Sequence, residues 1–443
     1  MKTFTIGGVH PPECKLTAGK SIVDMPLPKQ AVVLLGQHIG APTQAVVEKG
    51  MSVKTGQLLA KAGGFVSANI HSPVSGKVNK IGKVVDASGY PRPAIFIDVE
   101  GDEWVEGIDR SDDLLSECTL EPADIVKKIN EAGIVGMGGA CFPAHVKLTP
   151  PPGKKAEVLV VNGVECEPYL TADHRLMLEK GPEIMVGIRI LMKALNVNRA
   201  VIGIECNKPN AIELLQHLAQ PYANIEVMPL KMHYPQGGEK QLIEATTGRQ
   251  VPSGALPIEV GAVVQNVGTV FAIYEAVQKN KPLIERIVTV TGKSLTNPGN
   301  FRARIGTSVN DMIAFAGGLP ETAGKVISGG PMMGKALASL DAPVAKGTSG
   351  ILVMDEQESV RGEASDCIRC AKCVAACPMG LEPYLLGSLS EHKDWEGLEK
   401  LHIMDCIECG CCTFTCPAHR PLLDYLRIGK AKVGAIIRSR KQQ

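Results

Sequence analysis

The chain has 443 residues, of which 44% are hydrophobic and 21% are charged, and its formal net charge is +1. A chain of this length exceeds one ordinary hydrophobic core and predicts about three or four domains. Its hydrophobic content argues against a disordered protein. The near-zero net charge lacks the basic field that non-specific phosphate binding needs, so we expect no nucleic-acid partner.

The cysteines and the apolar stretches indicate where such a protein works. Fourteen cysteines are present, and those outside two C-terminal runs are scattered singly, which is typical of a reducing compartment and not of a disulfide framework. The N-terminal residues lack the apolar core of a signal peptide. The most apolar long stretch, residues 255–277, contains several polar residues and does not predict a membrane-spanning helix. We therefore expect any link to a membrane to run through a partner subunit or a surface contact.

Residues 1–105 predict a small β domain. Between residues 29 and 99, short β-branched runs are divided by Gly, Pro and Asn, as in a β-barrel or β-sandwich. Two runs, Gly50 to Gln57 and His71 to Val78, resemble the halves of a biotinyl or lipoyl barrel-sandwich domain. Such domains carry a modified lysine, but residues 62–76 contain none. We interpret the domain as a barrel-sandwich-like structural or docking module and not as a swinging-arm carrier.

Residues 120–283 alternate predicted strands and helices, which is typical of an α/β domain. We expect helices at 123–132, 182–195 and 210–218, with strands at 157–161, 199–204 and 225–229. A glycine-rich segment, Gly133 to Lys147, follows the first helix. Its backbone N–H groups and the Lys147 ammonium together suit a phosphate group. A glycine run alone also fits an ordinary helix-capping turn.

Four motifs in this domain resemble, in the same order, those of the NADH-binding flavoprotein subunit of respiratory complex I. They begin at Gly138 (Gly-Gly-Ala-Cys-Phe-Pro), Asn162 (Asn-Gly-Val-Glu-Cys-Glu-Pro), Tyr234 (Tyr-Pro-Gln-Gly-Gly-Glu) and Gln265 (Gln-Asn-Val). The resemblance implies a Rossmann-like domain that binds FMN and NADH.

Carried over position by position, the resemblance implies two groups of site residues. FMN would be held by Gly136, Gly138, Gly139, Ala140, Lys147, Asn162, Gly237 and Asn266. The nicotinamide side and the NADH site would be lined by Phe142, Glu165, Glu167 and Glu239. Acidic groups near the ribose favour a free 2′-hydroxyl and repel a 2′-phosphate, so we expect NADH over NADPH.

The chain departs from that family at two positions. Met137 replaces an arginine that usually precedes the paired glycines, and Gly238 replaces a glutamate of the third motif. Cys141 and Cys166 are isolated, so we interpret both as small packed residues.

Residues 284–350 resemble the soluble-ligand-binding β-grasp domain that follows the flavin domain in the same complex I flavoprotein. We expect a strand at Ile287, a helix from Val309 to Ala316, and a strand at 326–328 that leads into a glycine-rich turn. We interpret this domain as a spacer and the methionine pair of the turn, Met332 and Met333, as flexible packing.

Residues 355–443 contain two copies of the pattern Cys-x2-Cys-x2-Cys-x3-Cys-Pro. This spacing is typical of two [4Fe-4S] clusters, in which the fourth cysteine of each run ligates the other cluster. Zinc also suits thiolates, but zinc sites use separated cysteine pairs. The pattern therefore predicts a helical, ferredoxin-like domain with one cluster on Cys367, Cys370, Cys373 and Cys416. It predicts the second cluster on Cys377, Cys406, Cys409 and Cys412, and we expect Cys411 to point away from both.

The flavoprotein of complex I carries a single cluster, whereas this chain has two complete runs and a β domain in front. The whole chain resembles the RnfC subunits of the Rnf electron-transport complexes, which are ion-translocating ferredoxin:NAD+ oxidoreductases. The resemblance implies a peripheral NADH-linked oxidoreductase subunit on the cytoplasmic face of the plasma (inner) membrane, with the other subunits as partners and ferredoxin reached through them. Two alternatives stay open: a soluble NADH-dependent flavin and iron–sulfur reductase, and an electron-transfer or docking subunit without its own flavin.

Overall fold

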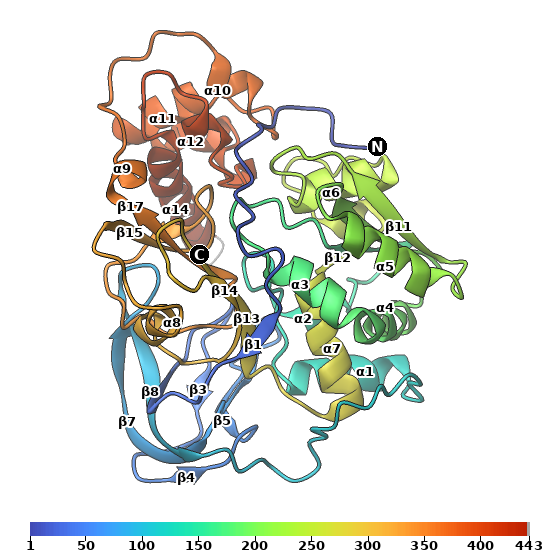
Figure 1. Cartoon of the computed structure of the whole chain (residues 1–443). Coiled ribbons are helices and arrows are strands. Elements are labelled where there is room, and N and C mark those ends of the chain that lie inside the picture. The colour runs from blue at the N-terminus through green and yellow to red at the C-terminus, as the bar shows by residue number, and fades with distance from the viewer. Residues whose placement is uncertain (441–443) are drawn as a thin grey trace.

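The computed structural model describes residues 1–440, which form four domains in contact (Figure 1). The N-terminal β domain and the β-grasp domain lie on one side of the molecule and the α/β domain lies on the other. The helical C-terminal domain sits above the β-grasp domain in this view. Among the helices of residues 1–440, none combines the length and the apolar composition that crossing a bilayer requires.

The N-terminal β domain is built from two sheets, as the strand pattern predicted. The sheets have the orders β2-β8-β7-β4 and β3-β5-β6. Ala31 and Val33 on β2, with Ile95 and Ile97 on β8, alternate toward the core between the sheets. The strands are β2 (Gln30–Leu34), β3 (Gln44–Ala45), β4 (Ser52–Val53), β5 (Leu58–Lys61), β6 (Ile70–His71), β7 (Ser75–Val85) and β8 (Pro91–Gly101).

Residues 1–25 run outside this two-sheet core. The segment descends between the α/β domain and the C-terminal domain, where it is drawn in dark blue (Figure 1). Val9 forms an isolated bridge with Tyr234. Strand β1 (Ile22–Asp24) pairs in parallel with β14 of the β-grasp sheet. The N-terminal segment therefore connects three domains.

The α/β domain has a parallel sheet of order β11-β10-β9-β12. Leu159 and Val161 of β9 pack with α1, α4 and α7, whereas Val158 and Val160 pack with α6 on the other face. The strands are β9 (Val158–Asn162), β10 (Ala200–Glu205), β11 (Ile225–Leu230) and β12 (Ala262–Asn266). The helices are α1 (Pro122–Glu131), α2 (Ala144–Lys147), α3 (Ala172–Glu179), α4 (Gly181–Leu195), α5 (Pro209–Ala219), α6 (Glu239–Thr247), η1 (Pro257–Val260) and α7 (Val267–Lys279).

The strand order reverses direction at β9. The chain moves from β9 to β10 and β11 on one side and returns to β12 on the other. In open α/β sheets, ligands bind at the carboxyl ends of the strands that flank such a switch point. Asn162 and Asn266 end these two strands and are register partners. The fold therefore creates a crevice at two residues that the sequence assigns to FMN.

The β-grasp domain has a six-stranded mixed sheet of order β1-β14-β13-β17-β15-β16. Helix α8 (Val309–Phe315) packs on it through Val309, Met312 and Ile313. The Ser308 hydroxyl caps this helix by accepting a hydrogen bond from the Asp311 N–H at 3.0 Å. The remaining strands are β13 (Glu285–Thr291), β14 (Gly299–Arg304), β15 (Ala323–Ser328), β16 (Lys335–Ala336) and β17 (Gly350–Asp355).

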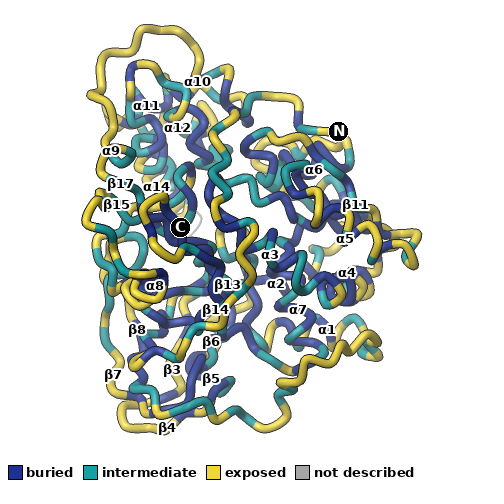
Figure 2. The backbone as a smooth tube through the Cα atoms, viewed as in Figure 1, coloured by how far each residue is buried: buried dark blue, intermediate teal, exposed yellow. Residues whose placement is uncertain are grey.

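The C-terminal domain is helical, and the last three residues of its predicted range, 441–443, lie outside the described residues. The segment between α9 and α10 is exposed along its length (Figure 2). The helices are α9 (Glu356–Ser359), α10 (Lys372–Ala375), α11 (Pro383–Glu391), α12 (Trp395–Lys400), η2 (Ile403–Asp405), α13 (Cys411–Phe414) and α14 (Leu422–Arg440).

Candidate functional site

The glycine loop between α1 and α2 is fixed against the switch point. The Gly136 N–H donates to the Phe142 carbonyl oxygen at 2.9 Å. A Cβ atom on Gly138 would lie 2.7 Å from Asn266 Nδ2, so only glycine fits there. The position of a Cβ on Gly139 has no neighbouring atom within 4 Å. Gly139 and Ala140 are exposed, so the loop presents open backbone to a ligand.

Asn266 holds a fixed orientation beside this loop. Its Oδ1 accepts a hydrogen bond from the Gly268 N–H at 2.8 Å and caps α7. Its Nδ2 donates to Asp173 Oδ2 at 2.6 Å. Burial raises the pKa of Asp173 to about 6, and the neighbouring Glu165 carboxylate contributes to this rise. No local pattern pointed to Asp173, because only the fold brings it to Asn266.

The other predicted FMN residues meet at the same edge of the sheet. Lys147 Nζ lies 2.6 Å from Glu239 Oε1 and donates to the Val264 carbonyl oxygen at 3.2 Å. Asn162 Nδ2 donates to the Gly237 carbonyl oxygen at 2.9 Å. Both charged side chains are partly exposed, so a phosphate group can compete with Glu239 for the ammonium.

The carboxylates of Glu165 and Glu167 are both hydrogen-bonded to backbone N–H groups. The Glu165 carboxylate accepts hydrogen bonds from the Asp173 and His174 N–H groups at 2.8 and 3.1 Å, at the start of α3. The Glu167 carboxylate accepts from the Met332 and Met333 N–H groups at 3.2 and 2.7 Å. Burial raises the pKa of Glu167 to about 7. Their role at the NADH site stays a prediction.

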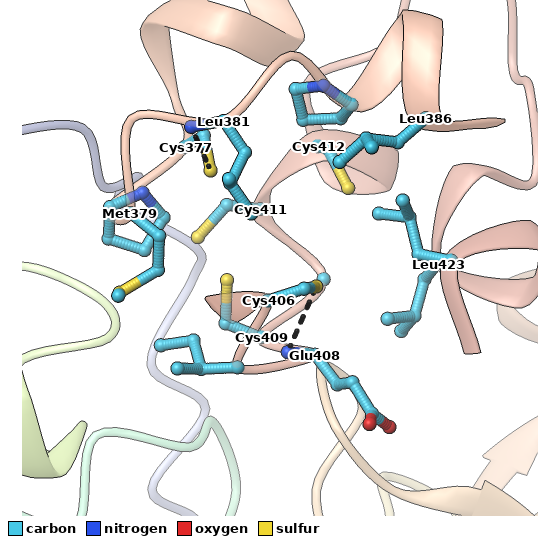
Figure 3. A pocket seen from close by; sticks show the side chains of 15 residues that line it. Cys377, Met379, Leu381, Leu386, Cys406, Glu408, Cys409, Cys411, Cys412 and Leu423 are labelled. Atoms are coloured by element: carbon cyan, nitrogen blue, oxygen red, sulfur yellow. Dashed lines mark hydrogen bonds between the residues drawn. The ribbon is translucent and has the colours of Figure 1, made fainter. Parts of the chain in front are cut away.

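A cavity in the C-terminal domain brings together the four cysteines of the predicted second cluster, Cys377, Cys406, Cys409 and Cys412 (Figure 3). Its other walls are largely apolar and include Leu381, Leu386 and Leu423. Burial raises the pKa of Cys406 to about 11, so this thiol keeps its proton unless a metal displaces it. A cavity walled by soft sulfur atoms and leucines suits an iron–sulfur cluster.

Cys411 lines the same cavity, contrary to the prediction that it points away from both clusters (Figure 3). It is completely buried, and its Sγ lies 3.9 Å from the Tyr234 carbonyl oxygen. Within residues 1–440, no three His, Cys, Asp or Glu side chains converge on one point as ligands of a single metal ion.

The first predicted cysteine set lies farther toward the surface. Cys373 is buried and packs in the same apolar core as Cys416. Cys367 and Cys370 are exposed on the segment before α10.

The two cysteine runs share one backbone conformation. Positive φ angles occur at Arg369, Ala371 and Gly380 of the first run. They recur at Glu408, Gly410 and His419, which are the equivalent positions of the second run. Left-handed backbone is uncommon outside glycine, so this repetition indicates two loops built for the same purpose.

The flavin-type site and the cysteine cavity touch. The Tyr234 hydroxyl donates to the Cys409 carbonyl oxygen at 2.8 Å. Gln241 Nε2 donates to the Pro378 carbonyl oxygen at 3.1 Å.

The β-grasp domain contacts both the α/β domain and the C-terminal domain, and its interpretation as a spacer stays a prediction. Its Met332 and Met333 N–H groups bind Glu167 of the α/β domain. The Met333 carbonyl oxygen accepts a hydrogen bond from Arg427 Nη2 of α14 at 2.7 Å. The Met332 side chain also packs with Tyr234, Cys409 and Cys411, as predicted for this residue, whereas Met333 is exposed.

Three family models match parts of the chain. They are the RnfC barrel sandwich hybrid domain at residues 3–102, the Nuo51 FMN-binding domain at residues 129–275 and the SLBB domain at residues 287–336. These matches agree with the barrel-sandwich, α/β and β-grasp domains expected from the sequence.

Similar proteins cover almost the whole chain. The C-subunit of the proton-translocating ferredoxin:NAD(+) oxidoreductase complex of Clostridium ljungdahlii is 50% identical over 98% of this chain and 94% of its own. The C-subunit of the Na(+)-translocating complex of Acetobacterium woodii is 44% identical over 96% of each chain. The C-subunit of the ion-translocating oxidoreductase complex of Rhodobacter capsulatus is 43% identical over 100% of this chain and 86% of its own.

A solved structure shares part of the fold. The crystal structure of an NAD+-reducing [NiFe]-hydrogenase in the H2-reduced state superposes with a TM-score of 0.52 and 20% identity. The match covers 71% of this chain and 63% of the hydrogenase chain.

Proposed function

The chain belongs to the RnfC family, the C-subunits of the ion-translocating ferredoxin:NAD(+) oxidoreductase (Rnf) complexes, and we propose that it is the NADH-binding, electron-transferring subunit of such a complex. It would pass electrons between NAD(H), FMN and two [4Fe-4S] clusters. The ion-translocating activity belongs to the assembled complex.

One observation carries the flavin part of this proposal. The register partners Asn162 and Asn266 end the two strands at the switch point, and Gly138 lies against Asn266. A glycine loop, a helix N-terminus and an ammonium at one crevice suit a flavin phosphate. Gly139 leaves room beside the loop for a bound group.

The cysteine cavity supports a defined order of electron carriers. The second set, Cys377, Cys406, Cys409 and Cys412, adjoins the α/β domain through the Tyr234 contact to Cys409. The first set includes the exposed Cys367 and Cys370. The second cluster would therefore exchange electrons with the flavin, and the first cluster would exchange them with a partner subunit.

Nicotinamide exchanges two electrons as a hydride, whereas each iron–sulfur cluster exchanges one. A bound flavin would connect them, because a flavin can exchange electrons in either number. The residues of this chain bind and orient the group. Lys147 would neutralise its phosphate, and Asn266 would offer its remaining amide hydrogen on the side of the glycine loop. Glu239 would then be released from Lys147 and become free to contact the ribose of NADH.

The proposal is tested with the anaerobically purified full-length chain. NADH should bleach both flavin and cluster absorbance, and a flavin-depleted sample should retain cluster absorbance that NADH no longer bleaches. Cluster reduction at full rate without flavin would contradict the proposed route. A chain that holds clusters but takes up no flavin would instead be an electron-transfer or docking subunit.

A further inference from the structure

Lys15 reaches from the N-terminal segment into the loop formed by residues 165–170, which follows β9. Its Nζ donates hydrogen bonds to the carbonyl oxygens of Glu165, Glu167 and Leu170, at 2.8, 2.9 and 2.7 Å. An ammonium group has three N–H donors, so this loop uses all of them. Backbone carbonyl oxygens that converge on one point form a cation site, as in the filters of ion channels. Here a side chain of the same polypeptide supplies the cation.

The backbone of the 165–170 loop needs contacts that hold it in place. Glu165 and Tyr169 adopt left-handed φ angles of 46° and 69°. Left-handed backbone is unfavourable outside glycine and persists only where the surrounding structure fixes it. The N-terminal segment supplies a second contact, because the Tyr169 N–H donates to the Glu13 carbonyl oxygen at 2.8 Å. The N-terminal segment therefore holds the loop at both of its ends.

One carboxylate of the loop leads to the flavin-type crevice. The Glu165 carboxylate accepts hydrogen bonds at the start of α3, including one from the Asp173 N–H at 2.8 Å. Asp173 Oδ2 accepts from Asn266 Nδ2 at 2.6 Å. Gly138 of the glycine loop lies against this Asn266 side chain. Consecutive hydrogen bonds thus connect Lys15 to the crevice.

The other carboxylate of the loop leads to the cysteine cavity. Glu167 Oε1 lies 3.4 Å from the Tyr234 hydroxyl, which donates to the Cys409 carbonyl oxygen at 2.8 Å. The Glu167 carboxylate also accepts from the Met332 and Met333 N–H groups. The Met332 side chain packs in turn with Cys409. The 165–170 loop therefore joins the crevice to the cavity.

We propose that Lys15 is a positioning residue for electron transfer between the flavin and the second cluster. Its ammonium acts as an internal cation that holds the 165–170 loop, and through the loop it sets the relative positions of the crevice and the cavity. Two one-electron steps would oxidise the reduced flavin, reduce two clusters and release one proton. Reactions between fixed groups are sensitive to displacements on the order of 1 Å. The inference rests on the proposed function, because a flavin and a cluster must occupy the two sites.

Lys15→Ala tests this inference, because it leaves a space that a free cation can fill. In the anaerobically purified full-length chain, stopped-flow absorbance after NADH addition separates flavin reduction from cluster reduction. The cluster phase of Lys15→Ala should slow roughly tenfold, with flavin and iron contents unchanged. Propylammonium matches the deleted atoms and should restore the rate, whereas tetramethylammonium has the same charge but no N–H donor and should not. Lys20→Ala is the matched control, because Lys20 is an exposed lysine of the same segment.

Lys15→Met keeps the length of the side chain without its charge. It should slow the cluster phase as Lys15→Ala does, and it keeps the test decisive if Lys15→Ala folds poorly. Equal cluster phases in the Lys15 variants and in Lys20→Ala would overturn the inference. Equal rescue by the two ammonium ions would also overturn it, as would a loss of flavin or iron that accounts for the whole change in rate. Failure of the unaltered chain to take up flavin would overturn the proposed function as well, and is recognised before any variant is compared.

Discussion

The hydroxyl of Tyr234 donates a hydrogen bond to the backbone carbonyl oxygen of Cys409, at 2.8 Å. Tyr234 begins the third flavin-type motif, and Cys409 is a predicted ligand of the second cluster. Burial raises the pKa of Tyr234 well above its usual value, so the hydroxyl remains a donor across the physiological pH range. This contact joins a flavin-type motif of the α/β domain directly to the backbone of a predicted cluster ligand.

Tyr234→Phe should slow electron transfer between the flavin and the clusters. The change removes one interdomain hydrogen bond, worth about 1 kcal/mol, and leaves a buried carbonyl without its donor. Iron and flavin contents should stay unchanged. Stopped-flow absorbance after NADH addition separates flavin reduction from cluster reduction. Tyr90→Phe is the control, because Tyr90 is 64% exposed in the β domain, and equal cluster rates in both variants would contradict the prediction.

The metal content should reflect two complete ligand sets. Anaerobically purified protein is expected to hold about eight iron and eight acid-labile sulfide. Cys373→Ser should remove one cluster and destabilise the C-terminal domain, because cluster binding also contributes folding free energy there. Iron and sulfide analysis, with electron paramagnetic resonance of the reduced protein, checks both statements. Zinc without sulfide would contradict them.

Cys411→Ser provides a sharper version of that experiment. Cys411 lines the cavity, but its Sγ faces the Tyr234 carbonyl oxygen and the ligand pattern does not need it. We therefore expect both clusters to be retained in Cys411→Ser. Loss of half the iron would make Cys411 a ligand in place of one of its neighbours.

Lys147→Ala should weaken flavin retention without changing the iron content. The ammonium of Lys147 lies near the carboxyl ends of β9 and β12 and pairs with Glu239. A phosphate group at this position could replace Glu239 as its partner. Flavin fluorescence after gel filtration measures retention. Lys154→Ala is the control, because Lys154 forms a comparable 2.5 Å pair with Glu259 away from the loop. NADH should reduce the flavin much faster than NADPH, and full flavin content in Lys147→Ala would count against the site.

Lys346 should make the stability of the chain depend on pH. Its buried Nζ donates to the carbonyl oxygens of Asn69 and Gly133, at 2.6 and 2.7 Å, in two other domains. Burial lowers the pKa of Lys346 to about 7. Above this pH the folded state releases a proton that the unfolded state still binds, so stability should rise with pH.

Comparison with Lys346→Met isolates this effect. The unaltered chain should gain stability relative to the variant between pH 7 and pH 9, by at most about 1.4 kcal/mol per pH unit. Urea unfolding at several pH values measures the difference. Parallel pH profiles of the two proteins would show that Lys346 does not titrate in this range.

Local patterns were enough to predict several of the longer elements of the fold. The predicted helix at 182–195 corresponds to α4 (Gly181–Leu195), and the predicted strand at 199–204 corresponds to β10 (Ala200–Glu205). These elements are long and periodic, so the sequence specifies them without tertiary information. Asn162 and Asn266 were assigned to FMN through the family resemblance and not through a local pattern, and the structure adds that the two residues end neighbouring strands.

Other features depend on contacts between distant parts of the chain. Glu167 binds the N–H groups of a turn in another domain, and Arg286 reaches Met137 across a domain boundary. Neither contact leaves a local signal. The spacing of cysteines along the chain does not specify the direction of their side chains. Cys411 shows this: it follows the left-handed Gly410 at the start of α13, and its side chain lines the cavity.

The last prediction concerns attachment to the membrane. Proteins of this family are subunits of translocating complexes, and two cysteines of the predicted first cluster, Cys367 and Cys370, lie on an exposed segment. If the contact with the partner is largely polar, salt screens it. High-salt washing of native membranes should therefore release this chain with its iron, while the membrane-embedded partners stay behind. Immunoblots of the wash and the pellet, with an embedded partner as the control, measure this. Recovery of the native chain only from the soluble fraction after gentle lysis would favour a soluble NADH-dependent reductase instead.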